Sequence, residues 1–592
     1  MSDFSAEQKR YLEGMAAGMA VVKSVGAPAG AAAPAAPPSG PDAIHLAAQD
    51  KTLAAGHKLA DPEKWKRAEH PFEAYGRLKR EADAGKAPSV PDNFRWRYHG
   101  LFWVAPAQTS YMARLRIPNG ILNHWQFAGV AALADQYGGG YTHVTTRANL
   151  QVREIAPESA APFLEGLSDL GLTGRGAGAD NIRNVTGSPT AGIDPQELID
   201  TRPLARAWHF HILNERAMIG LPRKFNVSFD GGGKIPALEE TNDIGFQAVR
   251  VLDGAPVEAG VWMRLALGGI SGHRDLARDT GAVVRPADCT AVADAIVRVF
   301  VAEGDRTNRA KSRLKYVLDR LGFDGFLARV EDVLGRTLDR VDAAHLAPRP
   351  MTDRMAHLGV HPQAQDGRIY VGVVVPVGRL TTDQMRGIAA IARELGDGDV
   401  RLTVWQNLLV SGVARERAGD VEARLAALGL SAQPTSIRAG LVACTGMTGC
   451  KFANAHTKES ALDIAAHVEA RLALDVPVNI HLTGCPNSCA QHYIGDVGLI
   501  GVKVPVGSEG DTVEGYDIVV GGGFAENAAI GRMLWTAVPA ERAAVHVEAL
   551  LRAYLDGRRG PDESFQQFTL RVGVDHLKGV APAATRALEA AE

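Results

Sequence analysis

The order of apolar and polar residues predicts a small α/β unit after residue 110. Residues 111–117 alternate in the manner of a strand, and residues 125–136 place apolar side chains at helical intervals. Residues 142–154, rich in Thr and Val, read as extended chain that forms a strand pair, and a second helix is expected before residue 172. This order is typical of an α/β sandwich of the ferredoxin-like kind.

The same pattern occurs again further along the chain. Residues 116–172 match residues 374–430 at a constant offset of 258, and residues 243–269 match residues 496–523 more loosely. Such self-similarity predicts a duplicated chain, in which each half is a small sandwich followed by a larger α/β portion. A cleft between such halves could hold a large cofactor. The matched pairs are Pro118 and Pro376, Gly120 and Gly378, Thr145 and Thr403, Asn149 and Asn407, Val152 and Val410, Gly171-Leu172 and Gly429-Leu430, Asp243 and Asp496, and Gly268-Gly269 and Gly522-Gly523.

The N-terminal region reads as a helix and a tether. Residues 5–24 repeat apolar side chains at helical intervals, and residues 26–41 contain only Gly, Ala and Pro apart from Ser39. The predicted segments are, in order, an N-terminal helix (1–25), an Ala/Pro/Gly linker (26–42), a wrapping segment (43–100), a ferredoxin-like half-domain (101–175), a larger cofactor and substrate domain (176–345), a second ferredoxin-like half-domain (346–433) and a second larger cofactor domain (434–592).

Composition and charge limit the classes of function. The chain has 592 residues with 64 Lys and Arg against 67 Asp and Glu, a formal net charge of −3, which argues against nucleic acid as a main partner. A membrane-spanning helix would need ~18 consecutive apolar residues, and the sequence has no such run. The first ten residues lack the basic and apolar regions of a signal peptide. We therefore expect a cytoplasmic protein without membrane or nucleic-acid partners.

Four of the five cysteines lie between residues 444 and 489. They form a C-x5-C pair, Cys444 and Cys450, and a C-x3-C pair, Cys485 and Cys489. Zinc sites usually have tighter spacing, whereas a cubane cluster is larger than one ion and accepts thiolates from two loops. The spacing favours an iron–sulfur cluster and leaves zinc or free thiols as alternatives. Cys289 follows Asp288 at a predicted helix start; we interpret it as a buried side chain, although a helix N-terminus can lower a thiol pKa.

Five motifs, LVACTGMTGC, HLTGCPNSCAQ, VTTRANLQVR, DNIRNVTGSP and LPRKFNVSFDGG, resemble those of the sirohaem-dependent nitrite and sulfite reductases. The resemblance extends over residues 95–580 and implies the pseudo-duplicated α/β (α+β) fold of that family. It also implies a [4Fe–4S] cluster beside a sirohaem. In that family four cysteines bind the cluster and the last also bridges to the sirohaem iron. Carried over, the ligands are Cys444, Cys450, Cys485 and Cys489, with Cys489 as the bridge.

A sirohaem carries several carboxylates, so its pocket needs fixed positive charge, for which Arg is well suited. The first half supplies Arg114, Arg147, Arg153, Arg183, Arg223 and Lys224 in short motifs. Any one of them could instead lie on a solvated surface. The resemblance implies that Arg114, Arg183, Lys224 and Asn226 surround the substrate, and that Arg147, Gln151, Arg153 and Arg223 bind the macrocycle. In the second half Trp405 replaces Arg147.

One position bears on the substrate. Sulfite-reducing members of the family typically have Lys-x-Lys where this chain has Lys224-Phe225-Asn226, the pattern of the nitrite-reducing members. Nitrite carries less charge than sulfite, so an amide can bind it without an excess of positive charge. In a strand, residues two apart share a face, so Lys224 and Asn226 are expected to point at one anion. The resemblance thus implies six-electron reduction of nitrite to ammonia.

The chain has no Gly-rich dinucleotide fingerprint after a predicted strand, so electrons are expected from a separate donor such as ferredoxin or a flavodoxin. A monomer is expected. Sulfite reduction is the main alternative. Precorrin-3B synthase, a relative, is disfavoured by the full duplication and the Lys-x-Asn pair, and a zinc-stapled scaffold would leave the arginines unexplained.

Overall fold

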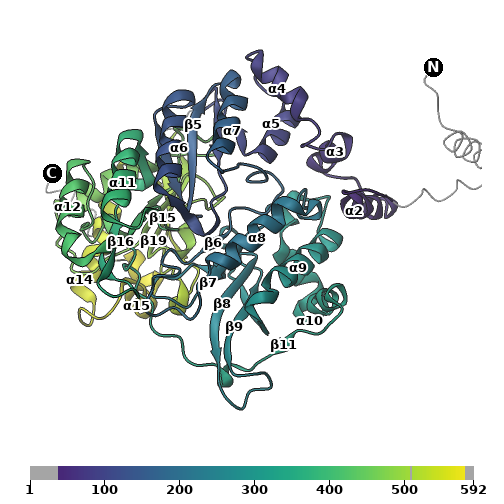
Figure 1. Ribbon diagram of the computed structural model, residues 1–592. Helices are drawn as coiled ribbons and strands as arrows, with labels where there is room; N and C mark the ends of the chain where they lie inside the picture. Colours follow the sequence, from purple (N-terminus) through teal and green to yellow (C-terminus); the bar gives the residue numbers. More distant parts are fainter. Residues whose placement is uncertain (1–37, 507–509, 580–592) are drawn as a thin grey trace, which may run out of the picture.

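A computed structural model describes residues 38–506 and 510–579 (Figure 1). The predicted helix at residues 1–25 and most of the predicted linker lie outside these residues. No helix within the described ranges is both long and apolar enough to cross a membrane.

The first described region, residues 43–96, consists of four helices that lie along one edge of the molecule in Figure 1. Helix α2 packs on helix α9 of the following large domain, and α4 packs on α7 of the first half-domain, so this region bridges two parts of the first half. Ser89 caps α5 by accepting a hydrogen bond from the Asp92 N–H. The helices are α2 (Ala43–Ala54), α3 (Asp61–Ala68), α4 (Tyr75–Asp83) and α5 (Val90–Trp96).

Two five-stranded sheets form the ferredoxin-like half-domains, and each sheet takes one strand from the other half. In the first sheet Leu380 of β14 pairs with Thr142 of β4, and in the second Leu122 of β3 pairs with Val400 of β15. The first sheet contains β1 (Leu101–Trp103), β2 (Tyr111–Arg114), β5 (Asn149–Ile155), β4 (Tyr141–Thr145) and β14 (Arg379–Thr381). The second contains β12 (Gly359–Pro362), β13 (Arg368–Val373), β16 (Leu408–Ala414), β15 (Asp399–Leu402) and β3 (Ile121–Asn123).

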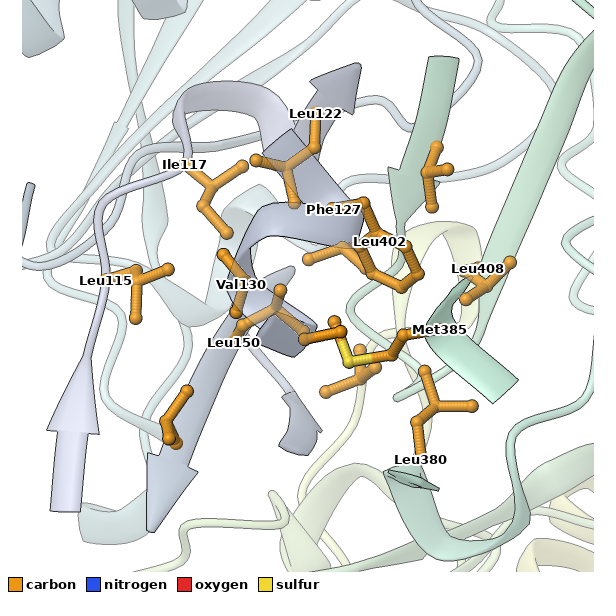
Figure 2. Close-up of a cluster of buried hydrophobic side chains, with 14 of the residues drawn as sticks. Leu115, Ile117, Leu122, Phe127, Val130, Leu150, Leu380, Met385, Leu402 and Leu408 are labelled. Carbon is orange, nitrogen blue, oxygen red and sulfur yellow. The ribbon is translucent and has the colours of Figure 1, made fainter. Parts of the chain in front are cut away.

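The exchange joins the two half-domains around one core. Helices α6 (His124–Tyr137) and α11 (Thr382–Leu395) pack against each other, and each begins with a capping box, at Asn123 and at Thr381. Figure 2 shows Phe127 and Val130 of the first half facing Met385 and Leu402 of the second. These side chains are fully buried, and each stabilises the fold by ~1.5–3 kcal/mol relative to an exposed position. Helices α7 (Ala160–Asp169) and α12 (Ala418–Ala427) complete the two copies.

The two larger domains are also built alike. Each sheet begins with three parallel strands and continues with antiparallel ones. The first contains β6 (Thr186–Gly187), β7 (Val227–Asp230), β8 (Ile244–Val251), β9 (Gly260–Leu267), β10 (Arg278–Val284) and β11 (Asp339–Arg340), with α8 (Arg202–Asn214), α9 (Cys289–Glu303) and α10 (Leu314–Leu334). The second contains β17 (Leu441–Ala443), β18 (Ile480–Thr483), β19 (Val497–Val506), β20 (Asp511–Val520) and β21 (Arg532–Pro539), with α13 (Thr457–Glu469), α14 (Ala543–Gly557) and α15 (Phe565–Val572).

Backbone details repeat between the halves. Asn119 and Val377, 258 residues apart, both have positive φ, of 60° and 45°. The backbone N–H of Asn226 donates to the Asp243 carboxylate, and that of Asn479 donates to the Asp496 carboxylate; each aspartate directly precedes a strand, β8 or β19. The predicted duplication and fold class are therefore confirmed.

Four local predictions can be compared with the described residues. The strand predicted at 111–117 ends at Arg114, and the extended chain predicted at 142–154 is two strands joined by a turn. The segment that carries Lys224 precedes β7 instead of belonging to it, because only Phe225 forms a bridge there, with Ile182. Cys289 is buried, as predicted, and burial raises its thiol pKa.

Candidate cofactor and anion site

The four clustered cysteines lie at one edge of the second large sheet. Cys444 follows β17 and Cys485 follows β18; because these strands are parallel neighbours, their carboxyl ends meet. The Cys444 N–H donates to the Leu482 carbonyl oxygen at 3.0 Å, and the Gly484 N–H donates to Cys444 Sγ at 3.2 Å. Two loops far apart in the sequence are thus brought together around the thiols.

Glycines make this close approach possible. A Cβ on Gly484 would lie 2.6 Å from the Cβ of Ala453, and one on Gly449 would lie 2.4 Å from an Arg153 nitrogen. Within residues 38–506 and 510–579, no three His, Cys, Asp or Glu side chains are grouped to hold a single metal ion.

The first half-domain turns a basic face of its sheet toward these loops. Arg114 and Gln151 are cross-strand neighbours on β2 and β5, and Arg153 follows on the same face. Arg153 donates to the Gly449 carbonyl oxygen at 3.1 Å and to Thr445 Oγ1 at 2.9 Å. These contacts place three of the predicted residues beside the cysteine loop.

The turn between β4 and β5 lies close to the last cysteine. Thr146 Oγ1 donates to the Cys489 carbonyl oxygen at 2.9 Å. The next residue, Arg147, donates from both terminal nitrogens to Asn242 Oδ1, at 3.1 and 2.9 Å. Asn242 was not identified from the sequence, although it adjoins the repeated Asp243.

The remaining predicted residues come from two loops of the first large domain. The Arg183 N–H donates to the Phe225 carbonyl oxygen at 2.8 Å, and the Phe225 N–H donates to Asn181 at 3.2 Å. Phe225 points into the core, whereas Lys224 and Asn226 on either side of it are half-buried. The alternation that the sequence predicted is therefore present without a regular strand.

Most of the predicted basic side chains have no carboxylate partner within the part of the chain that the structure describes. Among the described residues no carboxylate lies within 4 Å of Arg114, Arg147, Arg153, Arg183 or Lys224, whereas Arg223 lies 4.0 Å from Asp180. Burial lowers the pKa of Arg114 and of Arg147 to about 10 and that of Lys224 to about 7. Burial of several cations without a carboxylate partner is costly, so the arrangement favours an anionic group bound among them.

Cys489 is exposed, but it lies in electrostatic range of Lys224 and the other three clustered cysteines. A metal centre bound at this position would deprotonate the Cys489 thiol and bind the resulting thiolate. Proximity of Cys489 to the basic residues agrees with a shared site for a cluster and an anionic cofactor.

Unsatisfied polar atoms point to the same site. Asn226 Oδ1, Ser488 Oγ and Arg153 Nε are buried and have no hydrogen-bond partner among the described residues. Buried polar atoms normally have partners, so these atoms indicate a bound group or ordered water. The residues present therefore fit a sirohaem, whose carboxylates would pair with the arginines, together with a cluster on the cysteines.

The structure adds residues that sequence reasoning missed. Arg313 donates to both oxygens of Asp243, at 3.3 and 2.7 Å, and Asp180 accepts two hydrogen bonds from Arg309. Asp180 begins the motif DNIRNVTGSP, which was its only signal in the sequence. Lys458 of α13 is buried and donates to the Ala443 carbonyl oxygen at 3.4 Å, next to Cys444.

Comparisons with known proteins identify the family of the chain. The profile of the "Nitrite and sulphite reductase 4Fe-4S domain" matches residues 178–338 and 437–582, and that of the "Nitrite/Sulfite reductase ferredoxin-like half domain" matches residues 105–170 and 361–428. The chain belongs to the nitrite and sulfite reductase family. This confirms the family predicted from the motifs, and with it an oxidoreductase that uses a [4Fe–4S] cluster and sirohaem.

Relatives within the family are similar over most of their length. The ferredoxin–nitrite reductase of Synechococcus elongatus is 38% identical over 459 residues, which cover 76% of this chain and 86% of that protein. The chloroplastic ferredoxin–nitrite reductase of Zea mays is 36% identical over 474 residues, or 78% and 81% of the two chains. The Mycobacterium tuberculosis NirA structure matches with a TM-score of 0.81 and 27% identity, covering 89% of this chain and 99% of that one.

Proposed function

We propose that this member of the nitrite and sulfite reductase family reduces nitrite to ammonium. Each turnover consumes one nitrite, six electrons and eight protons and releases one ammonium and two waters. The observation that carries the proposal is the pair Lys224 and Asn226, one cation and one amide with an unsatisfied Oδ1, at the group of unpaired arginines near Cys489. The relatives named above as ferredoxin–nitrite reductases support it.

In this proposal Cys444, Cys450, Cys485 and Cys489 would hold the [4Fe–4S] cluster, and Cys489 would also serve as the ligand shared with the sirohaem. Arg147, Gln151, Arg153 and Arg223 would bind the macrocycle and its carboxylates. When bound, the two cofactors supply electrons one at a time to the anion. The four cysteines come from two loops that share hydrogen bonds, so loss of one ligand should disturb both loops.

The chain itself binds the anion and supplies protons. Arg114 and Arg183 present fixed positive charge, which favours an anion and polarises its N–O bonds. Lys224 can donate a proton to the bound anion from its ammonium. Burial lowers the pKa of Lys224, and bound carboxylates would raise it. Asn226 can hydrogen-bond one oxygen of the anion through its amide.

Nitrite is favoured over sulfite by the charge at residue 226. A second lysine at this position would favour the more highly charged sulfite, whereas an amide does not. Sulfite reduction is the second candidate, because the unpaired arginines would also attract a dianion.

For the electron donor we propose a separate ferredoxin, the donor in the names of the cited relatives. A flavodoxin stays an alternative. A monomer, a cytoplasmic location and the absence of nucleic-acid or membrane partners remain predictions from the sequence.

The proposal is tested on purified holoenzyme with an artificial one-electron donor. We expect a sirohaem-type visible spectrum, iron with acid-labile sulfide, and a catalytic efficiency for nitrite well above that for sulfite. Colourless protein that contains zinc would refute the cofactor assignment, and a preference for sulfite would refute the substrate.

A further inference from the structure

Helix α3 in the N-terminal region contains two buried charged residues that the proposed reaction does not use. Glu63 and Lys66 are only 1% and 6% exposed at their side chains, and they form an ion pair. Arg306 is a second cation at the same carboxylate, because its Nη1 donates to Glu63 Oε2 at 2.6 Å. Burial of ions carries a desolvation penalty, and apolar residues could hold the helix in place without it. The charges therefore indicate a role beyond docking of the helix.

Lys66 reaches the loop that leads to the proposed anion-binding residues. Its Nζ donates to the carbonyl oxygens of Gly220 and Leu221, at 3.2 and 2.9 Å. Pro222 follows and restricts the backbone before Arg223 and Lys224. A hydrogen-bonded ammonium on two consecutive carbonyls thus fixes the backbone three residues before Lys224.

The same ammonium also lies near the second loop of the pocket. Lys66 Nζ is 3.7 Å from the fully buried Asp180 carboxylate, which accepts hydrogen bonds at 2.7 and 2.8 Å from Arg309. Arg223 Nη1 lies 4.0 Å from the same carboxylate. Asp180 is three residues before Arg183, so Lys66 contacts the base of both loops.

The two loops are also joined directly. Asn181 Oδ1 accepts the Gly220 N–H at 3.0 Å, and the Asn181 carbonyl oxygen accepts the Phe225 N–H. Arg183 Nη2 donates to the Ala179 carbonyl oxygen at 2.7 Å, so its guanidinium position depends on this backbone. A shift at the base of either loop should therefore move Arg183 and Lys224 together.

We propose that Lys66 is a positioning residue of the anion site: its hydrogen bonds to Gly220 and Leu221, with its ion pair to Asp180, place Lys224 and Arg183 for binding. The inference rests on the proposed function in one respect, the binding of nitrite by these two residues. A misplacement of ~1 Å at a reacting site can cost on the order of 100-fold in rate, so a residue that does not touch substrate can control the reaction.

The test uses holoenzyme of the full chain with Lys66→Met, which keeps the length of the side chain and removes the ammonium. The matched control is Lys64→Met on the same helix, where Lys64 is exposed and pairs with Asp61 at 2.9 Å. We expect Lys66→Met to raise the nitrite KM about tenfold with a smaller change in kcat and with unchanged cofactor content. Lys64→Met should match the wild type, and Lys66→Arg, which restores charge and donors, should recover most of the KM.

A second readout does not depend on turnover. Hydrogen exchange of the backbone at residues 219–227 should become faster in Lys66→Met and remain unchanged in Lys64→Met. A loaded Lys66→Met enzyme with wild-type KM and wild-type exchange overturns the proposal. If the wild type does not reduce nitrite, the proposed function fails, and the exchange data alone decide whether Lys66 positions the loop.

If Lys66→Met does not fold or does not bind its cofactors, the proposal is tested with Glu63→Gln instead. This change keeps an acceptor for Lys66 but removes the negative charge of its partner. We expect about a threefold rise in the nitrite KM and faster exchange at residues 219–227. Wild-type KM in a loaded Glu63→Gln enzyme would then overturn the proposal.

Discussion

Two equivalent turns in the duplicated half-domains present opposite chemistry. The β4–β5 turn presents Arg147, and the β15–β16 turn presents Trp405 at the matching position. Each turn contains a left-handed residue directly afterwards, Ala148 with φ 45° and Gln406 with φ 62°. Arg147 donates to the Asn242 amide oxygen and has no carboxylate within 4 Å among the described residues. Trp405 is buried, and the centroids of the His357 and Phe524 rings lie 5.6 and 4.5 Å from its ring.

The two larger domains also share a backbone feature that has different surroundings in each half. The Asn226–Asp243 hydrogen bond of the first half has its counterpart in Asn479–Asp496 of the second. Both aspartates pair with an arginine, Asp243 with Arg313 and Asp496 with Arg354. In the first half the neighbouring Lys224 has no carboxylate within 4 Å among the described residues, whereas Arg354 of the second half also lies over the Phe524 ring at 5.3 Å. The backbone framework was thus retained in both halves, while one position became a basic pocket and the other a packed, charge-balanced core. Four predictions test this comparison.

The largest effect is expected when a clustered cysteine of the second half is replaced and compared with a buried cysteine of the first half. Cys485→Ser should abolish activity and remove iron and labile sulfide, because cluster ligation is coupled to folding of both loops. Cys289→Ser, at a buried thiol of the first half, is the control and should keep the full cluster content. Iron and sulfide analysis of both variants is the measurement; full retention in Cys485→Ser would refute the ligand assignment.

The second prediction compares the two turns. Trp405→Ala should lower the free energy of unfolding by ~3–5 kcal/mol through loss of a buried ring, with sirohaem binding retained in the folded protein. Arg147→Ala should instead weaken sirohaem binding by ~1.5–3 kcal/mol through loss of a charge-assisted bond, with little effect on stability. Denaturant melts and cofactor titrations separate the two outcomes. Equal profiles for both variants would show that the turns do not differ in role.

The third prediction concerns the amide that favours nitrite. Asn226→Lys adds a cation near Lys224 and should shift the ratio of catalytic efficiencies toward sulfite about tenfold, or ~1.4 kcal/mol. Nitrite turnover should fall, because like charges lower the pKa of Lys224 further. Asn226→Gln keeps the amide and serves as the control. Steady-state rates with each anion give the ratio, and an unchanged ratio in Asn226→Lys would remove the main support for nitrite.

The smallest effect should be the same in both halves. Asn123 caps α6 and Thr381 caps α11, each through a capping box. Replacement of either by Ala should cost ~1 kcal/mol of stability, because each cap accepts one helix N–H that would otherwise lack a partner. Thermal melts of the two single variants measure this. A much larger loss in one half would mean that the two copies no longer share their local framework.

Much of the fold followed from local patterns. The repeat and helix α6 were predicted because apolar periodicity acts over a few neighbouring residues. The exchange of β3 and β14 between sheets was not predicted, because each has three residues and a short strand does not specify its partner.

For the candidate site, too, some features followed from the sequence and others only from the tertiary structure. The sequence by itself determined the chemical types: four thiols in two loops, a set of arginines, and one Lys-x-Asn pair. Only the tertiary structure decided that Arg153 contacts the cysteine loop and that Lys66 lies under the anion-binding loops, across gaps of 296 and 155 residues. Such contacts depend on how whole sheets and helices pack, and no spacing along the chain encodes them. Within residues 38–506 and 510–579, Arg114 and Lys224 have no carboxylate within 4 Å, which is likewise a property of the packed structure, since charge pairing is decided by neighbours in space.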